Sequence, residues 1–187
     1  MKTTLKNTGI LLAITLVAVT ALAFVYERTK EPIARAEQAQ KAAAYQQVYE
    51  AASSFDDCLD GAALRQFNDA RTDGSSVEEI LAAKDAAGET LGYVLTAVST
   101  KGYGGEIKLA LGIDKTGTVV GYAVLNHSES PGFGANCENA DVREQFIGIT
   151  GVDEVDGISG ATYTTKALKQ ETQAALELVA QMGGDAQ

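Results

Sequence analysis

The sequence predicts an α+β protein, in which an N-terminal transmembrane helix and a helical stalk precede an antiparallel sheet packed by helices. Three features of the sequence predict this class. An apolar run lies close to the N-terminus, a glycine-free segment rich in Ala, Glu, Gln and Lys follows it, and short β-type segments lead to a final amphipathic helix. At 187 residues the chain has room for one globular domain and an appendage.

The apolar run extends from Gly9 to Tyr26, after a short N-terminus of residues 1–8. At a rise of about 1.5 Å per residue it spans about 27 Å, close to the roughly 30 Å hydrocarbon core of a bilayer. A cleaved signal peptide is the alternative, because lysines precede the run and Ala21-Leu22-Ala23 is typical of a cleavage site. We expect a retained transmembrane helix, since the apolar run continues beyond that site. Basic residues flank the span on both sides, so charge alone does not set its orientation.

Residues 27–55 predict a helical stalk. Pro32 either kinks this stalk or begins a new helix at its first turn. Tyr45, Val48 and Tyr49 recur at helical spacing, so we expect the last turns of the stalk to dock on the domain that follows. That domain takes in residues 56–187.

Short β-type segments are expected between Ala62 and about His127. Leu91–Val98 is rich in residues that favour strands, and Glu106–Ile113 alternates as a half-buried strand does. Asp114-Lys115-Thr116-Gly117 is a turn signal, after which Val119–Leu125 returns as the partner strand. These segments predict an antiparallel hairpin.

Two helices are expected in the last third of the chain. Asp141–Phe146 predicts a short helix, and Thr165–Met182 predicts a longer one with Lys166 and Lys169 on its polar face. Its apolar face consists of Leu168, Ala175, Leu176 and Val179.

Composition excludes several functions. The net charge of −10 and the pI near 4.5 argue against a nucleic-acid partner, because no basic stripe is present to neutralise phosphates. Cys58 and Cys137 lie far apart and neither belongs to a C-x-x-C pair, so we expect no metal site. A disulfide and two buried free thiols both remain possible. No Ser-His-Asp set, catalytic carboxylate pair or phosphate-binding glycine loop is evident, which argues against a hydrolase.

Two glycine-rich segments contain aromatic residues. In Gly102-Tyr103-Gly104-Gly105-Glu106-Ile107, glycines allow close backbone approach and an exposed ring, although a simple hairpin turn has the same composition. In His127–Gly134, a proline between small residues and glycines on both sides of Phe133 suit a loop that wraps a planar ligand. The alternative is an ordinary long connection. We expect His127 to be structural, because nothing supplies a catalytic triad around it.

The most informative segment runs from Asp156 to Thr165, D-G-I-S-G-A-T-Y-T-T. It places the hydroxyl of Thr162 after two small residues and at the start of a helix. Backbone N–H groups and the helix dipole favour a phosphate at such a position. The alternative is that Thr162 or Thr164 only caps the helix.

The order of these motifs is G-Y-x-G-x-I, H-x-E-[ST]-P-G-[LF]-G, Q-F-x-G and D-x-x-S-G-A-T-x-T. It resembles the G subunit of the Rnf ion-translocating electron-transport complexes, in the FMN-binding domain family. The C subunit of the sodium-pumping NADH:quinone reductase is similar but usually longer. The resemblance covers nearly the whole chain. Its second block is E-S-P-G-F-G here, a conservative variant of E-T-P-G-L-G, and Gln145-Phe146-Ile147-Gly148 matches the third.

The resemblance implies FMN bound covalently through its phosphate to Thr162. The surrounding motif residues are Asp156, Ser159, Gly160 and Ala161. We expect Tyr103, Phe133 and Tyr163 to stack on the flavin ring. The remaining residues expected at the cofactor are Glu129, Pro131, Gly132 and Thr164.

The function that the resemblance implies is that of a membrane-anchored flavoprotein subunit, which relays electrons within an ion-pumping ferredoxin:NAD⁺ oxidoreductase. No catalytic group besides the flavin and no independent substrate turnover are expected. The implied partners are other membrane subunits, a flavin transferase that takes FMN from FAD, and membrane lipid. The N-terminus is expected in the cytoplasm and the C-terminal domain outside it. The alternatives are a free-standing extracytoplasmic FMN domain without ion pumping and a non-redox tethered binding module.

Overall fold

The computed structural model describes residues 2–184 of the chain. It consists of two compact units, Met1–Gln40 and Lys41–Gln187. The first unit is part of the helix α1 (Lys2–Val48), which is continuous through Pro32, so the proline begins no new helix.

The apolar part of α1 has the properties of a membrane span. The helix is long and apolar enough to cross a bilayer, and its large apolar side chains are exposed, with Leu22 at 70%. The hydroxyls of Thr15 and Thr20 donate to carbonyls one turn back, each at 2.8 Å. Both polar groups are therefore satisfied within the helix, as an apolar solvent requires.

The second unit contains a five-stranded antiparallel sheet in which every strand pairs with its neighbour in sequence. The strands are β1 (Ser54–Asp57), β2 (Ser75–Lys84), β3 (Thr90–Ser99), β4 (Ile107–Asp114) and β5 (Val119–His127). The predicted hairpin is confirmed as β4 and β5. In its turn, the carboxylate of Asp114 accepts the backbone N–H groups of Thr116 and Thr118 at 2.8 and 3.0 Å.

The sequence prediction was wrong at the start of the domain. A helix, α2 (Gly61–Asp69), lies where β-type segments were expected, and β1 lies before that range, where no strand was predicted. A tertiary contact holds α2, because the side chain of Asn68 exchanges two hydrogen bonds with the backbone of Val77, at 2.8 and 2.9 Å. A contact of this kind leaves no periodic signal in the sequence.

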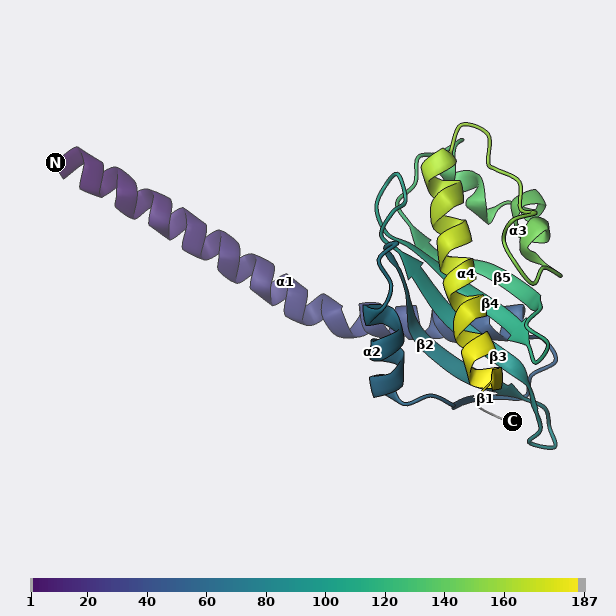
Figure 1. Ribbon diagram of the computed structural model, residues 1–187. Helices are drawn as coiled ribbons and strands as arrows, with labels where there is room; N and C mark the ends of the chain where they lie inside the picture. The colour runs from purple at the N-terminus through teal and green to yellow at the C-terminus, as the bar shows by residue number, and fades with distance from the viewer. Residues whose placement is uncertain (1, 185–187) are drawn as a thin grey trace. The chain divides into compact units, whose positions relative to one another are not determined.

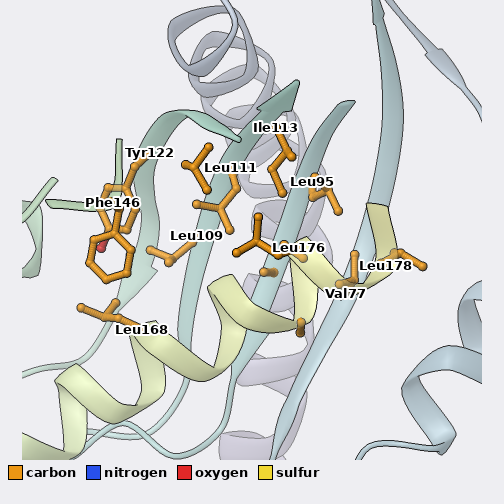
Figure 2. Packing of buried hydrophobic residues seen from close by; sticks show 14 of the residues in the cluster. Val77, Leu95, Leu109, Leu111, Ile113, Tyr122, Phe146, Leu168, Leu176 and Leu178 are labelled. Atoms are coloured by element: carbon orange, nitrogen blue, oxygen red, sulfur yellow. The ribbon is translucent and has the colours of Figure 1, made fainter. Parts of the chain in front are cut away.

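The predicted C-terminal helices are present as α3 (Ala140–Phe146) and α4 (Thr162–Gly184), with a 3₁₀ turn, η1 (Gly134–Glu138), ahead of α3. Figure 1 shows α4 lying across one face of the sheet. The main core lies between them. Figure 2 shows Leu109 and Leu111 of β4 facing this core with Leu168 and Leu176 of α4. The ring of Tyr122 is stacked on that of Phe146, and the ring centroids are 4.9 Å apart.

The opposite face of the sheet is covered by the last turns of α1, as predicted. Tyr45, Val48 and Tyr49 are buried there. The backbone of Val48 lies very close to two glycines of the sheet. A Cβ added to Gly112 would lie 2.4 Å from the carbonyl oxygen of Val48, and one added to Gly121 would lie 1.9 Å from the same oxygen. Strand β4, expected to be half-buried, is therefore buried on both faces.

Polar groups also fix the end of α1 on the sheet. The hydroxyl of Tyr45 donates to the carboxylate of Glu79 at 2.6 Å and lies 2.7 Å from the hydroxyl of Thr96. Lys41 forms an ion pair with the same carboxylate at 2.7 Å. Desolvation is offset here by hydrogen bonds and by the ammonium group, and the pKa of Glu79 is lowered.

The two cysteines are free thiols rather than a disulfide. Cys58 is half-buried, and its thiol lies 3.7 Å from the carbonyl oxygen of Ile80. Cys137 is fully buried in the main core. Burial and neighbouring carboxylates raise the pKa of the Cys137 thiol to about 12, so this thiol is inert at neutral pH.

A candidate flavin site at the start of α4

A pocket of about 540 Å³ lies at the N-terminal end of α4. The three segments singled out in the sequence all contribute to its lining, although they are far apart in the chain. The lining residues are Tyr103, Glu129, Ser130, Pro131, Phe133, Gly134, Gly160, Ala161, Thr162, Tyr163 and Thr164.

The carboxylate of Glu129 joins the three segments. One of its oxygens accepts the backbone N–H of Gly104 at 2.9 Å, and the other accepts the hydroxyl of Thr164. Only 6% of the Glu129 residue is exposed. A buried carboxylate is stable only when donors satisfy it, so this residue fixes the positions of the two segments that it contacts.

Two glycines make room for Glu129 and for the residue before it by lacking a side chain. A Cβ added to Gly134 would lie 2.2 Å from Oε2 of Glu129, and one added to Gly104 would lie 1.9 Å from the carbonyl oxygen of Ser128. Both distances are far shorter than van der Waals contact. The glycines of the motifs therefore serve close approach of the backbone, as the sequence indicated.

The start of α4 offers backbone donors to the pocket. The first hydrogen bond of the helix runs from the N–H of Thr165 to the carbonyl oxygen of Ala161 at 2.9 Å. The N–H groups of Thr162, Tyr163 and Thr164 consequently have no carbonyl one turn back. Donors of this kind, together with the helix dipole, favour an anion.

Three threonines lie at this helix start, and the structure distinguishes their hydroxyls. Thr164 is fully buried and donates to Glu129. Thr165 donates to the carbonyl of Ala161 at 3.0 Å and accepts the N–H of Ile158 at 2.9 Å. Thr162 is exposed, and its hydroxyl makes no hydrogen bond within residues 2–184. Neither Thr162 nor Thr164 is hydrogen-bonded as a helix cap, and only Thr162 has an available hydroxyl.

Three aromatic side chains line the pocket while remaining open to solvent. Tyr103, Phe133 and Tyr163 each expose more than half of their surface. Gly160 has a φ of +76°, and an added Cβ would lie 3.0 Å from Cδ1 of Phe133. The pocket thus combines exposed rings, which suit a planar ligand, with the anion-favouring start of a helix.

Three residues expected at the cofactor do not line the pocket, namely Asp156, Ser159 and Gly132. Asp156 instead donates its backbone N–H to Oε1 of Gln145 at 2.8 Å, which anchors the loop before α4 to α3. Gly132 adopts a φ of +78° within a turn. Ser130 and Gly134 line the pocket but were not selected, even though both lie inside the second segment.

His127 has a structural position. Its Nδ1 accepts the backbone N–H of Glu129 at 3.0 Å, and its Nε2 lies 3.2 Å from a carboxylate oxygen of Glu138. The first bond requires an unprotonated Nδ1, so the ring proton is on Nε2 and points to Glu138. The imidazole therefore supports the loop that presents Glu129.

Comparison with known proteins identifies two regions of the chain. Residues 102–177 match the FMN-binding domain model, and residues 1–48 match the RnfG N-terminal region model. The first match contains the whole candidate pocket. The fold itself confirms the predicted α+β class, with an N-terminal apolar helix, an antiparallel sheet and helices packed on it.

Curated relatives match over most of the chain. The G subunit of the ion-translocating oxidoreductase complex of Aliivibrio fischeri (strain MJ11) is 29% identical, over 94% of this chain and 90% of the relative. The G subunit of the proton-translocating ferredoxin:NAD(+) oxidoreductase complex of Clostridium ljungdahlii is 34% identical, over 51% of this chain and 57% of its own length. A crystal structure of NqrC from Shewanella oneidensis is 15% identical with a TM-score of 0.49, covering 74% of each chain.

One family model matches the N-terminal helix and the other matches the C-terminal domain. The relative from Aliivibrio fischeri aligns over both regions. The chain belongs to the family of G subunits of the Rnf-type ion-translocating oxidoreductase complexes, and its C-terminal part is an FMN-binding domain.

Proposed function

We propose that this protein is the membrane-anchored flavoprotein subunit of an Rnf-type ferredoxin:NAD⁺ oxidoreductase, and that it carries FMN as a phosphoester of Thr162. The observation that carries the proposal is the free, exposed hydroxyl of Thr162 at the start of α4, beside a pocket lined by aromatic rings. The match to the FMN-binding domain model and the names of the relatives support it.

Thr162 supplies the nucleophilic oxygen for attachment. In the reaction that a flavin transferase catalyses, this oxygen forms a bond to the FMN phosphorus of FAD. The pyrophosphate bond breaks, AMP leaves and the hydroxyl proton is released. The backbone N–H groups of Tyr163 and Thr164 are free to donate to the resulting ester. Gly160 and Ala161, which have small side chains, leave the attachment point accessible.

The aromatic residues of the pocket hold the flavin ring. Phe133 and Tyr163 offer rings to stack against the isoalloxazine, and Tyr103 lines the same pocket. Once bound, FMN supplies one- or two-electron redox chemistry, which no side chain of the protein can provide. The protein therefore acts as an electron carrier without substrate turnover of its own.

The proposed topology follows from the helix and the chemistry of attachment. Residues 1–8 lie in the cytoplasm, residues 9–26 cross the lipid, and α1 continues to an extracytoplasmic domain whose compact unit begins at Lys41, rather than at residue 56 as expected. Outside the cytoplasm no flavin pool replaces a lost cofactor, so a covalent bond retains it. The partners are the other membrane subunits of the complex and, during maturation, the flavin transferase.

A gel of the denatured protein tests the attachment. Full-length protein made together with a flavin transferase should fluoresce as flavin after denaturation and gain the mass of FMN less one water. Thr162→Val removes only the hydroxyl and should lose both signals. Thr164→Ser, which keeps its buried hydroxyl, is the matched control and should retain them. Fluorescence that persists in Thr162→Val would sink the proposal.

Purification tests the place of this subunit in a complex. A tagged full-length protein, extracted from its native membrane in mild detergent, should bring several integral membrane subunits with it. Isolation of the protein by itself, with its flavin still attached, favours the free-standing electron-transfer domain instead.

A further inference from the structure

A second pocket, of about 460 Å³, lies beside α4 and shares Thr162 with the aromatic pocket. Its α4 lining includes Thr165, Lys166 and Lys169, and Arg71 contributes from outside the helix. Thr162 thus belongs to two cavities of different chemistry, one lined by aromatic rings and one whose lining combines three cationic side chains with the carboxylates of Asp73 and Glu177.

The charges in the second pocket are not equally available. Arg71 forms ion pairs with Asp73 at 2.7 Å and with Glu177 at 2.6 Å, so its guanidinium is engaged by two carboxylates and these three groups together carry one net negative charge. Lys166 and Lys169 form no ion pair within the described part of the chain. These two lysines outweigh the remaining negative charge, so the charged side chains that line the pocket are net positive, in a protein whose net charge is −10.

Helix geometry directs one of these lysines toward Thr162. Residues four apart on a helix have Cβ atoms about 5–6 Å apart on the same face, which places Lys166 next to Thr162. Side chains on an α-helix also lean toward its N-terminus, so the Lys166 side chain leaves the helix in the direction of the start of α4. Lys169 lies almost one turn further along the same face.

We propose that this second pocket is a phosphate subsite, in which Lys166, assisted by Lys169, binds the anionic oxygens of the FMN phosphodiester at Thr162. The inference rests on the proposed function and assigns the two ends of the flavin to different cavities. The aromatic pocket takes the ring, and the lysine pocket takes the phosphate. A phosphodiester retains one negative charge at neutral pH, which an ammonium group and the free N–H groups of the helix start can share.

Lysine labelling measures the contact directly. Full-length protein in detergent, prepared with and without the flavin transferase, is treated with an acetylating reagent, and labelled peptides are quantified by mass spectrometry. Loading should slow the labelling of Lys166 by about fivefold, as expected for a paired surface ammonium. Lys115, exposed in the turn between β4 and β5, is the internal reference and should be labelled equally in both samples. Equal labelling of Lys166 in both samples would overturn the inference.

Variants test whether the contact acts through charge. With transferase limiting, Lys166→Met should acquire covalent flavin about fivefold more slowly than the parent protein at low salt, whereas Lys166→Arg and the control Lys115→Met should not. The difference should shrink near 1 M salt, where the Debye length falls to about 3 Å. Slow loading of Lys166→Met without protection of Lys166 in the labelling experiment assigns the lysine to transferase binding and also overturns the inference.

The two proposals fail in different ways. If the parent protein gains no covalent flavin, or if Thr162→Val gains it normally, the proposed function itself fails. If the parent protein is loaded at Thr162 while Lys166 is neither protected nor needed for loading, only the phosphate subsite fails.

Discussion

The hydroxyl of Thr164 donates a hydrogen bond to the buried carboxylate of Glu129, a residue 35 positions earlier in the chain. The bond connects the first turn of α4 with the loop that follows β5. The same carboxylate accepts the N–H of Gly104, so three separate segments meet at one side chain. This arrangement leaves Thr162, two residues before Thr164, as the hydroxyl that faces solvent.

Replacing Thr164 with valine should destabilise the domain. The change keeps the shape of the side chain but leaves a buried carboxylate oxygen without its donor, at a cost of about 1–3 kcal/mol in the free energy of unfolding. Urea denaturation followed by circular dichroism measures this loss. Thr164→Ser retains the donor and should lose much less. Equal stability of the valine and serine variants would show that the bond contributes nothing.

A side chain at Gly160 should strain the loop that presents Thr162. With a φ of +76°, this position costs a non-glycine residue about 1–2 kcal/mol, and the new Cβ would press on Phe133 at 3.0 Å. Gly160→Ala should therefore lower the denaturation midpoint. Gly157→Ala is the control in the same loop, because its nearest neighbours would be 3.9 Å away. If both variants unfold at the same midpoint, the strain argument is wrong.

Because Val48 approaches Gly121 so closely, we expect a side chain at position 121 to weaken the docking of α1 on the sheet. Gly121→Ala places a Cβ 1.9 Å from the Val48 carbonyl oxygen, so the backbone must shift at a cost of about 1–3 kcal/mol. Amide hydrogen exchange should become faster in residues 41–52 than in the parent protein. Gly151→Ala, which meets no atom within 4 Å, should leave that exchange unchanged. Unchanged exchange in Gly121→Ala would contradict the docking.

Glu171 is a fully buried acid on α4. Neither carboxyl oxygen has a hydrogen-bond partner by distance and angle within the described residues. The nearby backbone N–H of Ser99 favours the charged form less than burial disfavours it, so the pKa of Glu171 lies well above its ordinary value. Burial therefore favours the protonated form of this side chain in the folded domain.

This raised pKa sets the sign of a pH dependence. The folded state holds the Glu171 proton above the ordinary pKa of 4.5, where the unfolded state releases it. The stability contributed by the proton is complete below pH 4.5 and decreases as pH rises toward the folded pKa, by about 1.4 kcal/mol per pH unit. Glu171→Gln removes this dependence, so its advantage over the parent protein should grow from pH 5 to pH 8 in urea titrations. A constant difference would contradict a protonated Glu171.

Local patterns in the sequence were sufficient for several elements. The apolar face of α4, at Leu168, Ala175, Leu176 and Val179, is buried as predicted. The turn at Asp114–Gly117 joins β4 and β5, because the side chain of Asp114 binds backbone groups only two and four residues away. The docking turns of α1 were also predictable, since their helical spacing lies within one segment.

Contacts between distant segments were not predictable in this way. The helix α2 depends on the bonds of Asn68 to β2, and the burial of both faces of β4 depends on α1 lying over Gly112 and Gly121. Glu171 is a charged residue type, typical of an exposed helix face, but its side chain is fully buried near the backbone of Ser99 in β3. In each case, the deciding partner is a residue that no periodic pattern connects to the segment.

The sequence by itself determined the candidate site as a set of motifs, with Thr162 at a helix start and aromatic residues in two glycine-rich segments. Only the tertiary structure decided which hydroxyl is free to react. Thr164 and Thr165 resemble Thr162 in the sequence, but Glu129 binds the first, while Ala161 and Ile158 occupy the second. A hydrogen bond to a distant segment satisfies Thr164, and bonds within the folded loop before α4 satisfy Thr165, so the fold leaves Thr162 as the available hydroxyl of the three.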